Sequence, residues 1–431
     1  MSLALIFCIG AGTNAPAEAS LSLSEAIRLS QERSFKIKSS IFDSVGAVQD
    51  YRLSKSLRYP TLSLNAASFY VDNLPSMSFP LIGARNLGSK ENYQADIRLS
   101  LPLFTGGKIA NQIRISYENV RAKSLSLAAD QLNAAYRCRK AYLNLMLSRA
   151  VALSAKASLE RVRLVRQDVY NFHKSGLADS VDILEAELAY EIASLTGSER
   201  QSLARDASIA LMQILGLASD SEIAPGEMAP LPAEPVFRDS VPMTEIARPE
   251  LKILDSRIIA ANQLERFNKS SYFPSLSSYI GYSTGKPNRD FFNDKWNDYF
   301  TAGVTLNWEL NLGGKTSYSA GSARQAAFSA QMSKKELEES LTLMANIALE
   351  NLHQAYRTFV SSQKEYDIAR AKYRLGQEKQ KVGNLTVNRL LEMEAELSSA
   401  EQLYQASIIN YYLSETEYLY ATGSPKIYGG L

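Results

Sequence analysis

Few residues in this sequence have the types and spacing that active-site chemistry requires. The chain has two histidines, His173 and His353, and two cysteines, Cys8 and Cys138. Neither histidine has a second metal ligand at helical spacing, and two cysteines cannot build a disulfide scaffold. No nucleophile, base and orienting group cluster along the chain. We therefore expect no enzyme activity, no metal and no cofactor.

Two classes of ligand also find little support. The turn at Gly106-Gly107-Lys108 is similar to the end of a phosphate-binding loop, but it lacks the spacer before it and the hydroxyl residue after it. Forty-seven basic and 45 acidic residues give a net charge of +2, so no basic excess favours nucleic acid. No run of about 18 apolar residues occurs, so the sequence predicts no membrane-spanning helix.

The N-terminal residues have the pattern of a secretory signal peptide. An apolar stretch from Leu3 to Ala11 precedes Ala17-Glu18-Ala19, which places small residues where a signal peptidase cuts. The basic residues that normally precede such a stretch are missing. This defect indicates a misassigned start codon, and a disordered start of a cytosolic protein is the alternative. We predict a signal peptide at residues 1–19.

The rest of the chain contains two copies of one unit. Glycines at equivalent places lie 207 positions apart (314 − 107). The pairs that keep this offset are Gly107 and Gly314, Gly176 and Gly383, and Gly216 and Gly423. Prolines concentrate between the copies, as in a linker. The predicted parts are repeat 1 at 20–217, the linker at 218–243, repeat 2 at 244–423 and a tail at 424–431.

Each repeat is predicted to contain a pair of strands, at about 61–103 and about 275–310. The second strand of each pair alternates apolar and polar residues over about ten positions, which fits a bilayer-crossing strand with one wet and one lipid-facing side. A half-buried strand of a soluble sheet would give the same alternation. The candidate lumen residues on the polar side are Gln94, Asp96, Arg98, Thr301, Thr305 and Asn307.

Very long helices follow the strands. No proline occurs from Lys108 to about Phe172 or from Lys315 to about Arg374. At 1.5 Å per residue each helix is roughly 95–100 Å long, so we predict coiled-coil arms. Shorter helices are expected at 180–215 and 385–422 after a tight turn, and at 23–56 and 244–270 before the strands.

Four strands per chain cannot close a membrane barrel. Closed barrels start at eight strands, and lipid does not tolerate open sheet edges. Two copies would give eight strands around a bore filled by side chains, whereas three give twelve strands around a lumen. We therefore expect a homotrimer, which the internal repeat makes pseudo-sixfold.

Together these features resemble the TolC family of outer-membrane efflux proteins. The resemblance covers nearly the whole mature chain and rests on the repeat, the Pro-x-Leu strand starts, segment 101–108 and the turns at Gly176-Leu177 and Gly383-Asn384. It implies an α+β membrane protein of a Gram-negative outer membrane: a trimeric 12-stranded barrel continued by a periplasmic α-helical coiled-coil barrel.

The same resemblance implies a function and partners. The chain would be a passive exit duct that docks onto a periplasmic adaptor and an inner-membrane pump, either proton-driven or of the ABC type. Its cargo, small molecules or secreted proteins, stays open. The alternative is a soluble periplasmic coiled-coil scaffold without a pore, which gives the two-sided strands no role.

Candidate site residues also follow from the resemblance. The family's constriction acids match Arg389 and Glu392, and Arg389 departs from a purely anionic ring. The gate candidates are Asp182, Glu185, Arg389 and Glu392, with Asp182 expected to pair with Arg389. The candidates for adaptor docking are Gly176, Leu177, Gly383 and Asn384. Ordinary charges at a helix start, and turns with only a structural role, are the alternatives.

Overall fold

The chain divides into two compact units in its computed structural model. The hairpin unit comprises Met1–Ser40, Leu127–Pro249 and Leu337–Leu431, and the sheet unit comprises Ile41–Ser126 and Glu250–Glu336. The predicted signal peptide, apart from Ala19, lies outside the described residues. The structure describes residues 19–80, 83–218, 223–226, 229–236, 238–289 and 294–430.

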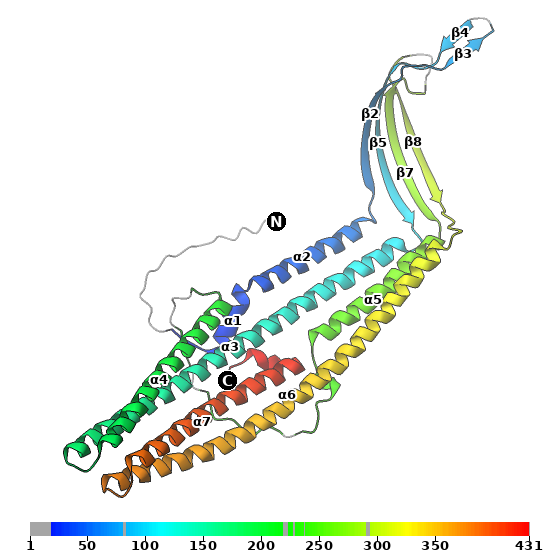
Figure 1. Ribbon diagram of the computed structural model, residues 1–431. Coiled ribbons are helices and arrows are strands. Elements are labelled where there is room, and N and C mark those ends of the chain that lie inside the picture. Colours follow the sequence, from blue (N-terminus) through cyan, green and yellow to red (C-terminus); the bar gives the residue numbers. More distant parts are fainter. Residues whose placement is uncertain are drawn as a thin grey trace. The chain divides into compact units, whose positions relative to one another are not determined.

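The sheet unit contains one four-stranded antiparallel sheet with the order β2-β5-β7-β8 (Figure 1). Its strands are β2 (Thr61–Tyr70), β5 (Glu91–Phe104), β7 (Ser275–Lys286) and β8 (Asn297–Asn307). Two-residue alternation and β-branched or aromatic side chains favour these strands. Between β2 and β5, the short strands β3 (Ser76–Phe79) and β4 (Gly83–Asn86) form a separate hairpin. Both predicted strand pairs are therefore present, and they meet in the middle of the sheet.

Helices adjoin the strands at both ends of each pair. The helices that lead into them are α2 (Phe35–Ser56) and α5 (Pro249–Lys269), and those that leave them are α3 (Lys108–Lys174) and α6 (Lys315–Lys381). Both long helices have 67 residues, which is about 100 Å at 1.5 Å per residue. Among the described residues, no helix is both long and apolar enough to span a membrane.

The corner between β5 and α3 depends on a glycine. Gly106 has φ +61°, and a Cβ there would lie 2.6 Å from the carbonyl oxygen of Ser270. An L-residue would be strained in this backbone conformation and would also collide with that carbonyl. The Gly-Gly-Lys segment thus serves as a close-packed corner at which a strand turns into a helix.

The hairpin unit contains two helical hairpins, α3–α4 (Ser180–Leu215) and α6–α7 (Val387–Thr422) (Figure 1). Both return helices have 36 residues. Gly176 and Gly383 turn the hairpins with φ +74° and +75°, and Gly216 and Gly423 cap α4 and α7 with φ +63° and +68°. Equivalent glycines therefore have the same left-handed conformation, which supports the repeat that their spacing predicted.

The segment expected as one helix at 23–56 is two helices, α1 (Leu23–Arg33) and α2. Ser34 has non-helical backbone angles (φ −58°, ψ 118°), and its hydroxyl accepts a hydrogen bond from the Ile37 backbone N–H at 3.4 Å. A serine at this place ends one helix and caps the next. The capping preference of Ser34 was the available sequence evidence for the break.

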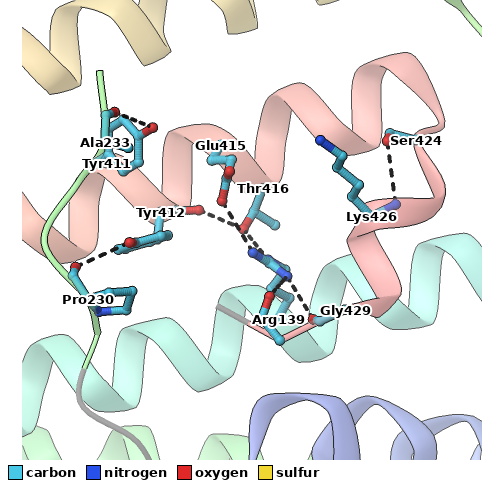
Figure 2. A network of polar contacts seen from close by, with 11 residues as sticks. Arg139, Pro230, Ala233, Tyr411, Tyr412, Glu415, Thr416, Ser424, Lys426 and Gly429 are labelled. Carbon is cyan, nitrogen blue, oxygen red and sulfur yellow. Dashed lines mark hydrogen bonds and ion pairs between the residues drawn. The ribbon is translucent and has the colours of Figure 1, made fainter. Parts of the chain in front are cut away.

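The proline-rich linker is held against the helices by specific hydrogen bonds. Tyr411 donates its hydroxyl to the Ala233 carbonyl at 2.9 Å, and Tyr412 donates to the Pro230 carbonyl at 3.2 Å (Figure 2). In the same unit, the short strands β1 (Ala19–Leu21) and β6 (Ile223–Pro225) pair in parallel. The core of the unit includes the fully buried Tyr142, Leu143, Leu211 and Leu215.

Candidate functional site

All six predicted lumen residues lie on one face of the sheet. Arg98 of β5 is opposite Gly281 of β7, and Gly281 is in turn opposite Thr301 of β8. Because side chains alternate along a strand, residues two positions apart from these share the same face. That face therefore carries Gln94, Asp96 and Arg98 of β5 and Thr301, Thr305 and Asn307 of β8.

The polar face has internal contacts, and one glycine makes room for them. Ser283 donates to Asp96, Gln94 donates to Asp96 at 3.1 Å, and the Arg98 guanidinium lies 5.0 Å from the centre of the Tyr279 ring. A Cβ at Gly303 would lie 2.9 Å from the Tyr279 hydroxyl, so this glycine leaves room for the tyrosine. Within the four strands, the charged residues of this face are Asp96 and Arg98.

The opposite face of the same sheet is apolar and uncovered. Leu64 of β2 is 73% exposed, and its neighbours on the face are similarly open. Large apolar side chains on this face include Leu62, Leu64, Ile97, Leu99, Ile280, Phe300, Val304 and Leu306. A contiguous exposed apolar surface of this kind marks a contact with lipid or with another protein.

The sheet also has two free edges in a single chain. Among the residues that the structure describes, strand β2 pairs with β5 alone and β8 pairs with β7 alone. The outward N–H and C=O groups of both edge strands are left to other partners. A sheet with one apolar face and two unpaired edges cannot be stable in lipid as a single copy, because lipid offers no hydrogen bonds.

At the hairpin tips, three of the four predicted gate residues make contacts with neighbours on their own hairpin. Asp179 caps α4, and Asp182 completes the capping box by accepting from the Asp179 N–H at 3.1 Å. Arg389 forms an ion pair with Glu392 one turn along α7. The expected pairing of Asp182 with Arg389 is therefore not formed within the chain, since each has a partner on its own helix. Glu185 is half-buried on α4.

The two tips share one hollow of about 780 Å³. Leu177 and Asp182 line it from the first hairpin, and Gly383 and Asn384 line it from the second. Three of the four predicted docking residues thus meet in a single concave surface, and Gly176 lies in the adjoining turn. Concave surfaces with a mixed polar and apolar lining are suited to binding a partner.

A buried ionic cluster joins the two hairpins and was missed at the level of sequence. Arg161 of α3 donates to Glu394 at 3.1 Å and to Glu401 at 3.2 Å, both on α7, and Ser158 donates to Glu394 at 2.9 Å. Glu394 is 4% exposed, so burial raises the pKa of its carboxyl, while the bonds from Ser158 and Arg161 oppose the rise. The only sequence indication was an acid inside the apolar stripe of α7.

A second buried cation, Arg139, holds the C-terminal segment. Figure 2 shows its guanidinium among Thr416, Glu415 and Gly429, which accept hydrogen bonds at 2.9, 3.3 and 3.0 Å. Arg139 is 1% exposed. Burial lowers the pKa of this arginine and the Glu415 carboxylate opposes the shift. Because the guanidinium is buried among these acceptors, its contacts attach the C-terminal segment to α3 and α7.

Within the described part of the chain, no cluster of histidine, cysteine and acidic residues could hold a metal ion. Cys138 is buried, and burial raises the pKa of its thiol to about 11, which keeps it protonated. The described residues therefore present binding surfaces and charged groups, and we find among them no set of side chains arranged for a covalent reaction.

The model of the outer membrane efflux protein family matches residues 26–217 and 242–411. The chain belongs to this family. The two matched segments correspond to the two repeats. This efflux protein is a passive channel of the outer membrane rather than an enzyme, and family members are components of tripartite systems with an adaptor and an inner-membrane pump. The expectations for fold class, function and localisation are confirmed.

Solved structures of outer-membrane channels share the fold at low sequence identity. CusC has a TM-score of 0.80 and 14% identity over 95% of this chain and 95% of its own. VceC from Vibrio cholerae has a TM-score of 0.78 and 14% identity over 93% and 96%. The open state of MtrE from Neisseria gonorrhoeae has a TM-score of 0.72 and 17% identity over 95% and 93%. No curated protein sequence matches the chain.

Proposed function

We propose that three copies of this efflux protein assemble into the exit duct of a tripartite export system. The observation that carries the proposal is the four-stranded sheet with one polar face, one apolar face and two unpaired edges. Three such sheets give a 12-stranded barrel in which β2 of one copy pairs with β8 of the next. Each unpaired edge then has a partner, as lipid requires.

In this assembly the two faces of the sheet have different surroundings. The apolar face around Leu64 and Val304 contacts outer-membrane lipid, and the polar face around Asp96 and Thr301 lines a water-filled lumen. Twelve strands leave room for such a lumen, whereas eight do not. The helical hairpins form the walls of a periplasmic tunnel.

The hairpin tips supply the docking surface and the gate. The hollow lined by Leu177, Gly383 and Asn384 receives the periplasmic adaptor, which connects the duct to an inner-membrane pump. Three copies of Glu392 around the axis favour cations. Each Arg389 partly offsets the negative charge of the Glu392 carboxylate with which it forms an ion pair. Asp182 and Glu185 occupy the equivalent turn of the first repeat.

A matched pair of charge substitutions tests the assignment of the two faces. Leu64→Lys puts a cation on the proposed lipid side at an expected cost of about 2–4 kcal/mol, while the adjacent Ser63→Lys puts it on the lumen side at little cost. We expect Leu64→Lys to reduce carbonate-resistant membrane retention and channel conductance, and Ser63→Lys to retain both. Equal behaviour of the two variants would contradict the assignment.

Mass photometry of the purified protein in detergent tests the number of copies. We expect a trimer that forms channels in planar bilayers. A folded monomer that needs no detergent would instead favour the soluble scaffold.

Small-molecule efflux and protein secretion are distinguished by the pump that co-purifies after cross-linking, because an ABC exporter points to secretion and a proton-driven pump to efflux.

A further inference from the structure

Helices α2, α3 and α5 line a hollow of about 590 Å³ within the sheet unit (Figure 1). All of its lining residues belong to that unit. Its size falls in the range of about 300–1,000 Å³ that is usual for small-molecule sites. None of its lining residues belongs to the predicted gate, the docking turns or the sheet.

Two buried polar atoms at this hollow have no hydrogen-bond partner among the described residues: Glu118 Oε2 on α3 and Ser256 Oγ on α5. Glu118 is 9% exposed and Ser256 is fully buried. The Arg121 guanidinium lies 3.9 Å from Glu118 Oε2, which is too far for a hydrogen bond. A buried carboxylate oxygen without a donor is unfavourable, so both atoms indicate a missing ligand.

The neighbouring hydroxyls cannot supply the missing donor. Ser54 donates to the Asp50 carbonyl at 2.9 Å, and its oxygen lies 2.6 Å from that of Ser116. Because a hydroxyl has one hydrogen, Ser116 must donate to Ser54, and neither hydrogen is left for Glu118. The buried polar side of the hollow therefore offers acceptors and requires a ligand that donates.

The remaining wall of the hollow is partly apolar. Leu53 of α2, Ile115 of α3 and Ile253 of α5 contribute to it. Water against such side chains is poorly held, and an apolar group that displaces it gains affinity. This combination favours a ligand with a donor group at one end and an apolar body at the other.

The charges around the hollow favour a cationic donor. Among its lining bases, Lys123 pairs with Asp43 at 3.0 Å, and Arg257 is exposed to solvent. The described residues include no cluster of ligands that could hold a metal ion. An ammonium group carries three N–H donors on a compact charge and so matches a carboxylate oxygen beside a hydroxyl.

We propose that this hollow binds a primary ammonium compound with an apolar body. The ammonium group donates to Glu118 Oε2 and Ser256 Oγ, and the apolar body packs against Leu53, Ile115 and Ile253. The site lies within one chain. It therefore goes beyond the proposed duct and does not depend on the number of copies.

Binding of dansylcadaverine, a primary ammonium compound with an apolar fluorescent body, tests the site by fluorescence anisotropy on the full-length protein in detergent. At equal concentration, n-hexylammonium should displace the dye, whereas n-hexanol should not. Glu118→Gln should weaken dye binding about tenfold or more, because the hydrogen bond loses its charged acceptor. The matched control, Glu336→Gln, removes an exposed charge of the same unit and should bind the dye like the unaltered protein.

Two further variants keep the test independent of folding at Glu118. Ser256→Ala removes the second acceptor and should weaken binding, although less than Glu118→Gln does. Arg257→Gln removes an exposed cation at the hollow and should strengthen binding, since like charges repel. If Glu118→Gln does not fold by circular dichroism, unchanged dye affinity in both of these variants would overturn the site.

The outcomes separate the site from the duct. Equal dye affinity of the unaltered protein and a folded Glu118→Gln variant, or equal displacement by n-hexanol, would overturn the site and leave water as the occupant of the hollow. Planar-bilayer conductance of the same preparation tests the duct by itself. A protein that conducts without binding the dye at Glu118 would overturn the ammonium site alone, and one that binds it without conducting would overturn the duct alone.

Discussion

Replacing Arg139 with alanine should release the C-terminal segment from the hairpin unit. The guanidinium is buried and bonds Thr416, Glu415 and the carbonyls of Gly429 and Gly430. Removing one partner of a buried charge pair costs about 3–5 kcal/mol. The side chain of Glu415 is 33% exposed and can regain water, so the lower end of that range applies here, about 3 kcal/mol.

Hydrogen exchange at the tail measures this loss locally. The amide of Ile427 bonds the Ser424 carbonyl at 3.2 Å, and that of Gly429 bonds the Lys426 carbonyl at 3.0 Å. A loss of about 3 kcal/mol in the opening free energy corresponds to exchange roughly 100-fold faster at both amides, since 1.36 kcal/mol is a factor of ten.

The matched control is Arg163→Ala. Arg163 pairs with Glu160 one turn away on the same helix, and both side chains are 57% exposed. A solvent-exposed pair of this kind contributes little to stability, so exchange at Ile427 should not change. If Arg139→Ala leaves the tail amides as protected as Arg163→Ala does, the argument that a buried cation fixes this segment is refuted.

Three further predictions concern the cluster, the gate and the corner. Burial raises the pKa of Glu394 above its ordinary 4.5, so the folded state binds this proton more tightly, and the carboxyl's contribution to stability falls as pH rises from about 4.5 through the folded-state pKa. Glu394→Gln should flatten that part of the pH profile of thermal unfolding, and an unchanged slope would argue against it. In planar bilayers, Glu392→Ala should lower cation selectivity and Arg389→Ala should raise it; unchanged opening and selectivity in both would exclude them as the gate. Gly106→Ala should cost about 2 kcal/mol or more and reduce trimer yield, because it adds left-handed strain to a collision with a backbone carbonyl. Gly313→Ala, where a Cβ meets open space, should have little effect, and equal yields would show that the corner tolerates a side chain.

Local patterns in the sequence predicted most of the fold. Alternation of apolar and polar residues along Tyr93–Leu101 predicted both the strand and its polar face, since a two-residue period is that of an extended β-strand. The glycines spaced by 207 positions predicted the turns because each has a positive φ that other residues avoid. Long proline-free stretches predicted the arms, although α6 continues to Lys381, beyond the expected end near Arg374.

Long-range partners could not be predicted in the same way. Arg161 and Glu394 are 233 residues apart, and nothing local to either residue specifies the other. Arg139 presents the same difficulty, because its acceptors include backbone carbonyls, which have no side-chain identity. At the tip, the sequence placed Asp182 and Arg389 in equivalent positions and suggested a pair. Each instead has a nearer partner, Asp179 and Glu392, at a smaller entropic cost.

The placement of Asp96 and Arg98 has a consequence for transport. These are the two charges on the polar face of the four strands, they have opposite signs, and they are next to each other on that face of β5. Seen from a few ångströms away, their fields largely cancel and leave a dipole with no net charge. A tube with such an interior would discriminate little between positive and negative solutes. Any sorting by charge would then fall to its narrow periplasmic mouth, and the outer opening would set a limit on size alone.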